Sequence, residues 1–344
     1  MSIQETNLKA IADAIRAKTG ETGTIVANDF ATKIAAIPTG MAKPRWVAIA
    51  MPTIADWISV CYGNGKFVAV VRDSAIAAYS ADGINWTQTT LPDNMYGASV
   101  CYGDGKFVAV TSHSSCNGYA SYSTDGINWT KTNMPGAKNW ASVCYGKGKF
   151  VAICYNELLS AYSTDGITWE SGRLPVREKW ESVCYGDGKF VAVVRDSAIA
   201  AYSTDGINWT QTTLGLETGS TAGNRRTVCY GGGKFVVIAS NGGNNAISAY
   251  STDGINWAQA TLPISAYYIP VCYGNGKFVA VAYSKDIAIY STDGINWTQT
   301  TLPKRKYWQS VCYGDGKFVA VNKNGDGDGD NVHAYLKDCF DSWA

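Results

Sequence analysis

The sequence predicts an all-β fold: a seven-bladed β-propeller of four-stranded blades, closed by pairing of an N-terminal strand with the last blade and preceded by a small α-helical N-terminal module. The main observation is a phrase, Val-Cys-Tyr-Gly-x-Gly-Lys-Phe, that occurs seven times at steps of 40 to 45 residues. Its cysteines are Cys61, Cys101, Cys144, Cys184, Cys229, Cys272 and Cys312. A second phrase, Ser-Thr-Asp-Gly-Ile-Asn-Trp, recurs between the copies and indicates a turn. The predicted domains are residues 1–40 and 41–344.

Composition places the chain among ordinary globular proteins. It has 344 residues, 46% of them hydrophobic, and a net charge of +1. A near-neutral balance argues against general binding to nucleic acid or to an anionic membrane, because both need a concentrated basic face. The N-terminus lacks the pattern of an export signal and no apolar run is long enough to span a bilayer, so membrane insertion is not expected. Seven of the ten cysteines occupy equivalent repeat positions and are expected to be reduced and buried.

The fourth repeat illustrates the expected blade. An inner strand ends at Tyr185, and Gly186-Asp187-Gly188 supplies a turn with positive φ. The second strand spans 190–194, the third spans 199–203, and the outer strand begins at Trp209. These four strands fill one repeat without strain.

The turn before each outer strand resembles the Asp-box of bacterial neuraminidase repeats, in a form one residue shorter than usual. In the fourth repeat it is Ser203-Thr-Asp-Gly-Ile-Asn-Trp209. The Asp carboxylate and the Ser hydroxyl are expected to accept the turn's backbone N–H groups, the Gly to adopt the left-handed conformation, and the Trp to fill the gap between sheets. We therefore interpret these residues as structural.

The last repeat lacks its own outer strand. Its turn has degenerated to Asp338-Cys-Phe-Asp-Ser-Trp343, and the sequence ends one residue later. At the other end, Trp46-Val-Ala-Ile-Ala-Met-Pro52 matches the outer-strand phrase of the other repeats. Residues 46–52 are therefore expected to complete the last blade, which removes the exposed sheet edges. Trp46 and Trp343 compete for the same position, and the sequence leaves open which one fills it.

The first forty residues contain two amphipathic segments with helical spacing, 7–18 and 28–37. The phrase Leu8-Lys-Ala-Ile-Ala-Asp-Ala-Ile-Arg-Ala-Lys-Thr-Gly20, followed by Ile25-Val-Ala-Asn-Asp-Phe-Ala-Thr-Lys-Ile34, resembles a module of tail and baseplate-associated proteins of phages and prophages of Gram-positive bacteria. The resemblance implies a virion protein that is made in the host cytoplasm, contacts other tail proteins through residues 1–40 and forms a homo-oligomer.

Function is expected on the face where the repeats differ. The constant Gly-x-Gly turns share one face with the Asp turns, and the opposite face carries a set of aromatic residues, with an arginine in the fifth repeat: Trp57, Tyr96, Trp140, Trp180, Arg225, Tyr268 and Trp308. Polar candidates on the same face are Arg72, Asp73, His113, Asn156, Glu157, Arg195, Asp196, Asn241, Asn244, Asn245, Lys285 and Asp286. Sugars stack on aromatic rings and bond to such polar groups, so this face is predicted to bind a glycan. The alternative is that the aromatics cap the blades and the polar residues are solvated.

One loop of the last repeat suggests a metal. Asn324-Gly-Asp-Gly-Asp-Gly-Asp-Asn331 offers the carboxylates of Asp326, Asp328 and Asp330 to one Ca²⁺. It lacks the closing acidic ligand of an EF-hand, so a flexible acidic loop is the alternative. No other cofactor is expected.

Catalysis is not expected. A sialidase needs three arginines converging on the substrate, a tyrosine nucleophile with a carboxylate partner, and an acid, and no such set stands apart from the repeats. The two histidines lie in no Ser or Cys constellation, and the obvious carboxylates are repeated turn residues. The sequence therefore predicts a non-enzymatic phage tail or receptor-binding protein that recognises a surface glycan of a bacterial host. A structural or protein-binding propeller is the alternative.

Overall fold

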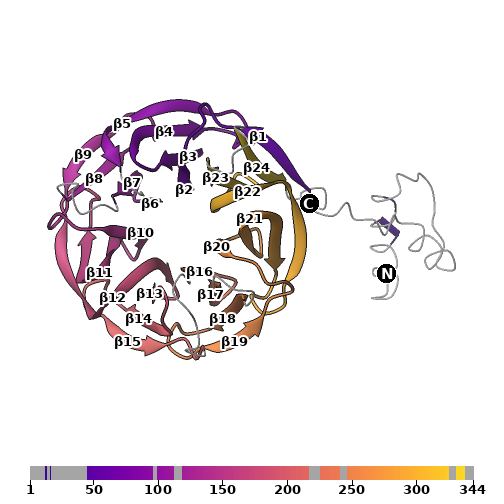
Figure 1. Cartoon of the computed structure of the whole chain (residues 1–344). Coiled ribbons are helices and arrows are strands. Elements are labelled where there is room, and N and C mark those ends of the chain that lie inside the picture. Colours follow the sequence, from indigo (N-terminus) through magenta and orange to yellow (C-terminus); the bar gives the residue numbers. More distant parts are fainter. Residues whose placement is uncertain are drawn as a thin grey trace, which may run out of the picture. The chain divides into compact units, whose positions relative to one another are not determined.

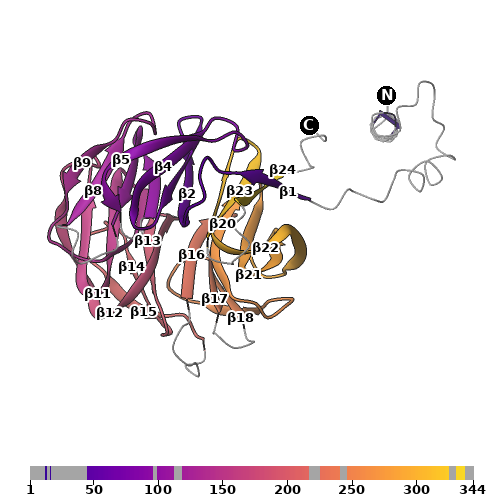
Figure 2. The same ribbon diagram turned by 45° about the horizontal axis from the view of Figure 1, so that its top comes forward.

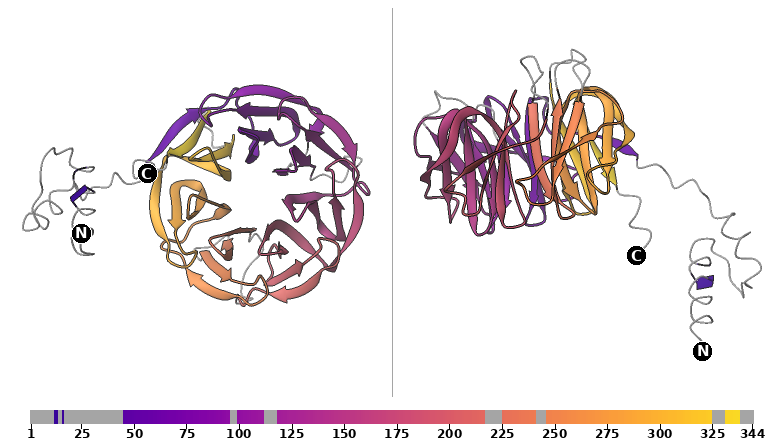
Figure 3. Two further views of the ribbon diagram at one scale, coloured as in Figure 1. Left: turned by 180° about the vertical axis from the view of Figure 1, so that it is seen from behind. Right: turned by 90° about the horizontal axis from the view of Figure 1, so that it is seen from below.

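The computed structural model describes Ala12, Asp13, Arg16 and residues 45–95, 99–111, 118–216, 225–240, 246–324 and 331–337. The chain divides into two units, Met1–Lys43 and Pro44–Ala344. The second unit is a β-propeller, in which antiparallel sheets surround a common axis (Figure 1). The strands run between the two faces of the ring, as the tilted and side views show (Figures 2 and 3).

The described strands form five hydrogen-bonded sheets. Three have four strands: β2 (Trp57–Gly63), β3 (Lys66–Val71), β4 (Ser74–Ser80) and β5 (Thr87–Met95); β6 (Ser99–Gly103), β7 (Lys106–Val110), β8 (Tyr119–Ser123) and β9 (Thr130–Asn133); and β16 (Arg225–Gly231), β17 (Lys234–Ser240), β18 (Ala246–Ser251) and β19 (Ala258–Thr261). Two have six: β10 (Trp140–Gly146), β11 (Lys149–Ser163), β12 (Glu170–Gly186), β13 (Lys189–Val194), β14 (Ile199–Ser203) and β15 (Thr210–Thr213); and β20 (Tyr268–Gly274), β21 (Lys277–Ser291), β22 (Thr298–Gly314), β23 (Lys317–Lys323), β24 (Val332–Lys337) and β1 (Trp46–Ala50).

The predicted count of seven four-stranded blades is therefore wrong. Strands β12 and β22, each 17 residues long, run without interruption from the outer strand of one repeat into the inner strand of the next. Residues 170–173 of β12 pair with β11, whereas residues 180–186 pair with β13. The connection between repeats is extended backbone at these two places, so the pairing continues where a blade boundary was expected. Within the five sheets, each of the seven Val-Cys-Tyr-Gly copies still forms a hairpin with the Lys-Phe strand that follows it.

The predicted helical module over residues 1–40 is also corrected. Ala12, Asp13 and Arg16 are the only described residues of this segment; their backbone is helical, but no helix is among the described elements. A segment of this length cannot bury a stable core by itself, and short helices are marginal in water. Among the described residues, no helix has the length and apolar character needed to cross a membrane.

The turn before each outer strand has the predicted hydrogen bonds. In the first repeat, Asp82 Oδ1 accepts the N–H groups of Ile84 and Asn85, both at 2.8 Å, while Ser80 Oγ donates to the same oxygen at 2.9 Å. Ser80 Oγ also accepts the N–H of Gly83, whose φ is +70°. The carboxylate therefore holds the turn from inside, as the sequence indicated. Burial opposes ionisation of Asp82, but these hydrogen bonds outweigh it and lower its pKa.

Adjacent inner strands interlock through a tyrosine and a glycine. A Cβ added to Gly186 would lie 1.9 Å from Cγ of Tyr230, so the ring of Tyr230 occupies the space that a side chain would need. The same relation joins Gly314 to Tyr62, the last repeat to the first. Each tyrosine also packs on the phenylalanine of its own hairpin, as in the Tyr62–Phe67 pair with ring centroids 4.7 Å apart. The repeated Tyr-Gly dipeptide is therefore the joint between neighbouring repeats.

The ring closes through both ends of the propeller unit. β1 pairs antiparallel with β24, with Trp46 opposite Leu336, so the predicted role of the N-terminal strand is confirmed. Trp46 is buried in the core of this last sheet, and Trp343 lies outside the described residues. In β24, the buried His333 accepts the backbone N–H of Asn322 through Nδ1 at 3.2 Å.

The eight described cysteines are free, and the other two lie outside the described residues. Burial raises the pKa of each inner-strand thiol, and neighbouring thiols raise several further, as Cys272 and Cys61 do for Cys312. Burial raises the pKa of Cys154 to about 12. A protonated thiol is a poor nucleophile, so these residues act as packing. The predicted burial is confirmed for Cys312, whereas the other six inner-strand cysteines are half-buried.

Candidate functional site

A polar cavity of about 430 Å³ lies where the inner strands begin. Its lining comes from the inner strands of every sheet, so the cavity lies on the propeller axis. Six hydroxyl residues at equivalent repeat positions line it: Ser59, Ser99, Ser142, Ser182, Thr227 and Ser310.

The serine hydroxyls connect neighbouring inner strands. Ser59 Oγ accepts the N–H of Val100 at 3.1 Å, and Ser310 Oγ accepts that of Val60 at 3.2 Å. Equivalent bonds run from Val143, Val183 and Val228 to Ser99, Ser142 and Ser182. In the sixth repeat Pro270 takes the place of the serine, and Thr227 Oγ1 has no hydrogen-bond partner among the described residues. Each bonded Oγ accepts one N–H and still has its own O–H to donate.

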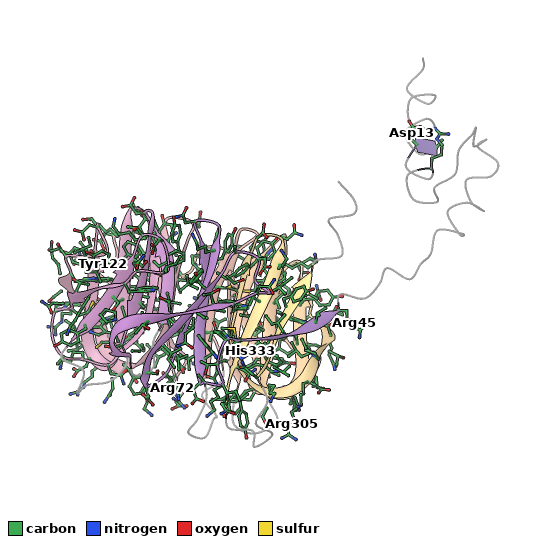
Figure 4. The ribbon with its side chains drawn as sticks, turned by 90° about the horizontal axis from the view of Figure 1, so that it is seen from above. Asp13, Arg45, Arg72, Tyr122, Arg305 and His333 are labelled. Carbon is green, nitrogen blue, oxygen red and sulfur yellow. The ribbon has the colours of Figure 1, made fainter. Side chains whose placement is uncertain are left out.

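The rim of the cavity is set by the residue five positions after the phenylalanine of each hairpin. This rim position is Arg72 in the first repeat, Tyr155 in the third and Arg195 in the fourth, and all three line the cavity. Their backbone N–H groups donate to the carbonyl of the residue directly before the tryptophan of the same repeat, as Arg195 does to Lys179 at 2.8 Å. The next residue has positive φ, 54° at Asp73, which turns the chain sharply. Figure 4 shows Arg72 and Arg305 at the same rim of the propeller, away from Tyr122.

Charge at the cavity is mixed, with arginine in excess. Arg72, Arg195 and Glu181 line it. Arg72 Nε is buried and has no hydrogen-bond partner among the described residues. Glu181 Oε2 accepts the backbone N–H of Arg226 at 3.0 Å. Burial lowers the pKa of the Arg226 guanidinium, against the opposing charges of Asp196 and Glu181.

The predicted aromatic ring does not surround the cavity. Trp57, Trp140, Trp180, Tyr268 and Trp308 are each 0% exposed. Trp180 packs with Phe190 and Trp209 in one core cluster, and its indole N–H donates to the carbonyl of Val176 at 3.0 Å. The reason is a β-bulge after this first residue: the strand register shifts between Trp180 and Ser182, so Trp180 packs in the core while Glu181 and Ser182 both line the cavity. The same shift follows Trp57, Trp140, Tyr268 and Trp308. These rings offer no surface for stacking a sugar.

The other predicted residues separate into two groups. The expected face carries Arg72, Arg195, Asp73, Asp196, Asn156, Glu157, Lys285 and Asp286. Asp196 forms an ion pair with Lys179, with 3.2 Å between Oδ2 and Nζ. Tyr96, His113, Asn241, Asn244 and Asn245 lie outside the described residues, and nothing of the side chain of Arg225 is described.

The calcium prediction stays a prediction. Asp326, Asp328 and Asp330 lie outside the described residues. Within the described part of the chain, no group of three or more His, Cys, Asp or Glu side chains could hold a metal ion.

Sequence reasoning missed the hydroxyl ring. The serines recur two residues after the tryptophans, and positions shared by the repeats were interpreted as packing. The signal that could have found them is their polarity: a hydroxyl at the same position in six repeats, in a strand that surrounds the axis, has to face either a partner or the channel.

No family model and no curated protein matches the sequence. Solved structures do match in fold. Virginiamycin B lyase from Staphylococcus aureus superposes with a TM-score of 0.70 at 10% identity, covering 85% of this chain and 99% of the lyase. YCF48 bound to a D1 peptide gives a TM-score of 0.64 at 16% identity, covering 87% of this chain and 98% of that one. Hydrazine synthase of Kuenenia stuttgartiensis gives 0.61 at 8% identity, covering 83% and 96%. At these identities the comparisons show the β-propeller fold alone.

Proposed function

We propose that this protein is a non-enzymatic binding propeller that holds an anionic glycan at the axial cavity. The observation that carries the proposal is the combination of a hydroxyl-lined cavity of about 430 Å³ with Arg72 and Arg195 at its rim. Serine and threonine hydroxyls bond to sugar hydroxyls, and arginines pair with carboxylate or phosphate groups in two parallel hydrogen bonds. The volume suits one or two sugar units.

The site has few groups arranged for catalysis. Glu181 is the carboxylate of the lining, and one carboxylate does not make the pair that glycoside hydrolysis requires. We therefore propose binding without cleavage, although one of the structures with the same fold is a lyase.

The biological setting remains a proposal that rests on sequence resemblance. Residues 8–34 resemble a phage tail module, and the ligand would then be a surface glycan of a bacterial host bound by a virion protein. A peptide ligand is the second candidate, because a propeller of the same fold binds a D1 peptide. Hydroxyls and arginines would serve a peptide that ends in a carboxylate.

The test is a binding screen of the full chain against an array of carboxylated, phosphorylated and neutral glycans and a set of acidic peptides. We expect anionic glycans to bind and to be recovered uncleaved. Arg72→Gln with Arg195→Gln should weaken binding about 10- to 100-fold, the range for hydrogen bonds to charged groups. Arg173→Gln, on the exposed outer part of β12, is the control that should leave binding unchanged. Preference for peptides, or full binding by the double variant, would overturn the proposal.

A further inference from the structure

A stacked tyrosine pair stands on the same face as the cavity, in the sixth and seventh repeats. The rings of Tyr283 and Tyr307 have centroids 4.6 Å apart and planes inclined by 21°. Tyr267 meets Tyr283 edge-on at 5.7 Å. Tyr267 directly precedes β20, whereas Tyr283 and Tyr307 lie inside the long strands β21 and β22, where they pair with each other. Unlike the buried tryptophans, all three rings are half-exposed.

Repeat geometry places this cluster on the rim. Tyr283 and Lys323 occupy the rim position, the place of Arg72 and Arg195 in the first and fourth repeats. Tyr307 lies two residues before Gln309, which lines the cavity. The rim therefore carries arginines in the first and fourth repeats and an aromatic pair beside the cavity in the sixth and seventh.

The cluster is surrounded by cations. Lys323 Nζ lies 5.4 Å from the ring centroid of Tyr307 and 5.8 Å from that of Tyr283, within the range of a cation–π contact. Arg305 is exposed and its Nε donates to the carbonyl of Ser284 at 2.9 Å, which fixes the guanidinium beside the pair. Lys285 and Lys304 lie in the same paired part of β21 and β22, where Asp286 is the one exposed acid among the described residues. In a chain with a net charge of +1, this is a local concentration of positive charge.

We propose that Tyr283, Tyr307 and Lys323, here called the tyrosine platform, form a second contact site for the anionic glycan, stacking one sugar ring while the cations pair with its carboxylate or phosphate. The class of ligand is taken from the proposed function, whereas the tyrosine platform as a binding site does not depend on the cavity. A half-exposed aromatic surface accepts the C–H face of a sugar, and the neighbouring ammonium and guanidinium groups select an acidic one. Single-stranded nucleic acid is less suitable, because it needs a longer basic track than four or five cations supply.

The test is electrophoresis of the folded full chain through native gels that contain polygalacturonate, dextran sulfate, neutral dextran or no polymer, with circular dichroism to confirm the fold of each variant. We expect the acidic polymers to retard the wild type and neutral dextran to leave it unaffected. Tyr307→Ala and Lys323→Ala should each weaken the apparent affinity about tenfold, while Tyr307→Phe, which keeps the ring, should retain it. The matched control is Lys317→Ala, at the opposite end of β23, which should behave as wild type.

The outcomes separate this inference from the proposed function. If platform variants bind like wild type while the double variant Arg72→Gln/Arg195→Gln fails, the platform is wrong and the cavity proposal stands. If the reverse holds, the platform stands alone. The platform is overturned as a glycan site if neither acidic polymer retards the wild type. It is also overturned if oligo-dT retards the wild type more strongly and the same substitutions abolish that effect.

Discussion

Substituting Gly186 by alanine tests how neighbouring repeats interlock. The φ of Gly186 is not positive, so its backbone conformation is compatible with alanine, and such a change by itself stabilises a protein by about 0.4–1 kcal/mol through the unfolded chain. The added Cβ, however, would lie 1.9 Å from Tyr230 Cγ and 2.3 Å from Cδ2. Overpacking of this kind costs about 1–3 kcal/mol. The two effects have opposite signs, and we expect a net loss of about 1–2 kcal/mol.

The assay is urea unfolding followed by circular dichroism and tryptophan fluorescence. With an m value of about 3 kcal/mol/M, the expected loss lowers the midpoint by about 0.3–0.7 M. Gly188→Ala is the matched control, because its Cβ would meet nothing within 4 Å and its φ is +74°. It should cost about 1–2 kcal/mol through backbone strain alone.

A double-mutant cycle separates the two mechanisms. Combined with Tyr230→Ala, the Gly186→Ala change should show a favourable coupling of about 1–2 kcal/mol, because the collision is gone, whereas Gly188→Ala should show almost none. A Gly186→Ala variant that is more stable than wild type would refute the interlock.

Other predictions concern the turns, the core and the closure of the ring. Hydrogen bonds from Thr168 and Ile167 outweigh the burial of Asp165 and lower its pKa to about 2, so its contribution to stability is present above the unfolded pKa of about 4 and is lost as the pH falls toward 2. Urea midpoints measured from pH 6 to pH 2 should therefore fall below about pH 4, and a flat profile would contradict the assignment of these bonds. Trp180→Ala should lower the free energy of unfolding by about 3–5 kcal/mol, measured with urea, since the side chain is 0% exposed. Under conditions where the variant is folded, its glycan affinity should equal that of wild type. A specific loss of binding would support the predicted role of the aromatic residues in binding. Trp46→Ala should destabilise by a similar amount and raise the amide exchange of β24 above that of β14, and equal protection of the two strands would show that β1 does not close the ring.

Local chemistry made much of the fold predictable. Ser203, Asp205 and Gly206 could be read as a closed turn because the hydrogen-bond capacity of a carboxylate and the conformational freedom of glycine act within a few residues. The third strand of the fourth repeat, Ile199–Ser203, was predicted with its observed bounds. The pairing of residues 46–50 with the last sheet was also predictable, because the last repeat lacks an outer strand and these residues match the outer-strand sequence of the other repeats.

The division into sheets and the lining of the cavity could not be predicted in this way. Whether β12 stops at Arg173 or continues to Gly186 depends on how the backbone between two repeats is held against neighbouring strands. Whether Trp180 faces the axis or the core depends on the orientation of the strand in the ring, which a one-residue shift reverses. The repeat, its turns and the residues available to each repeat follow from the order of the amino acids. That hydroxyls and arginines reach the axis, and tryptophans do not, follows from the folded ring, because side-chain direction is a property of the assembled sheets.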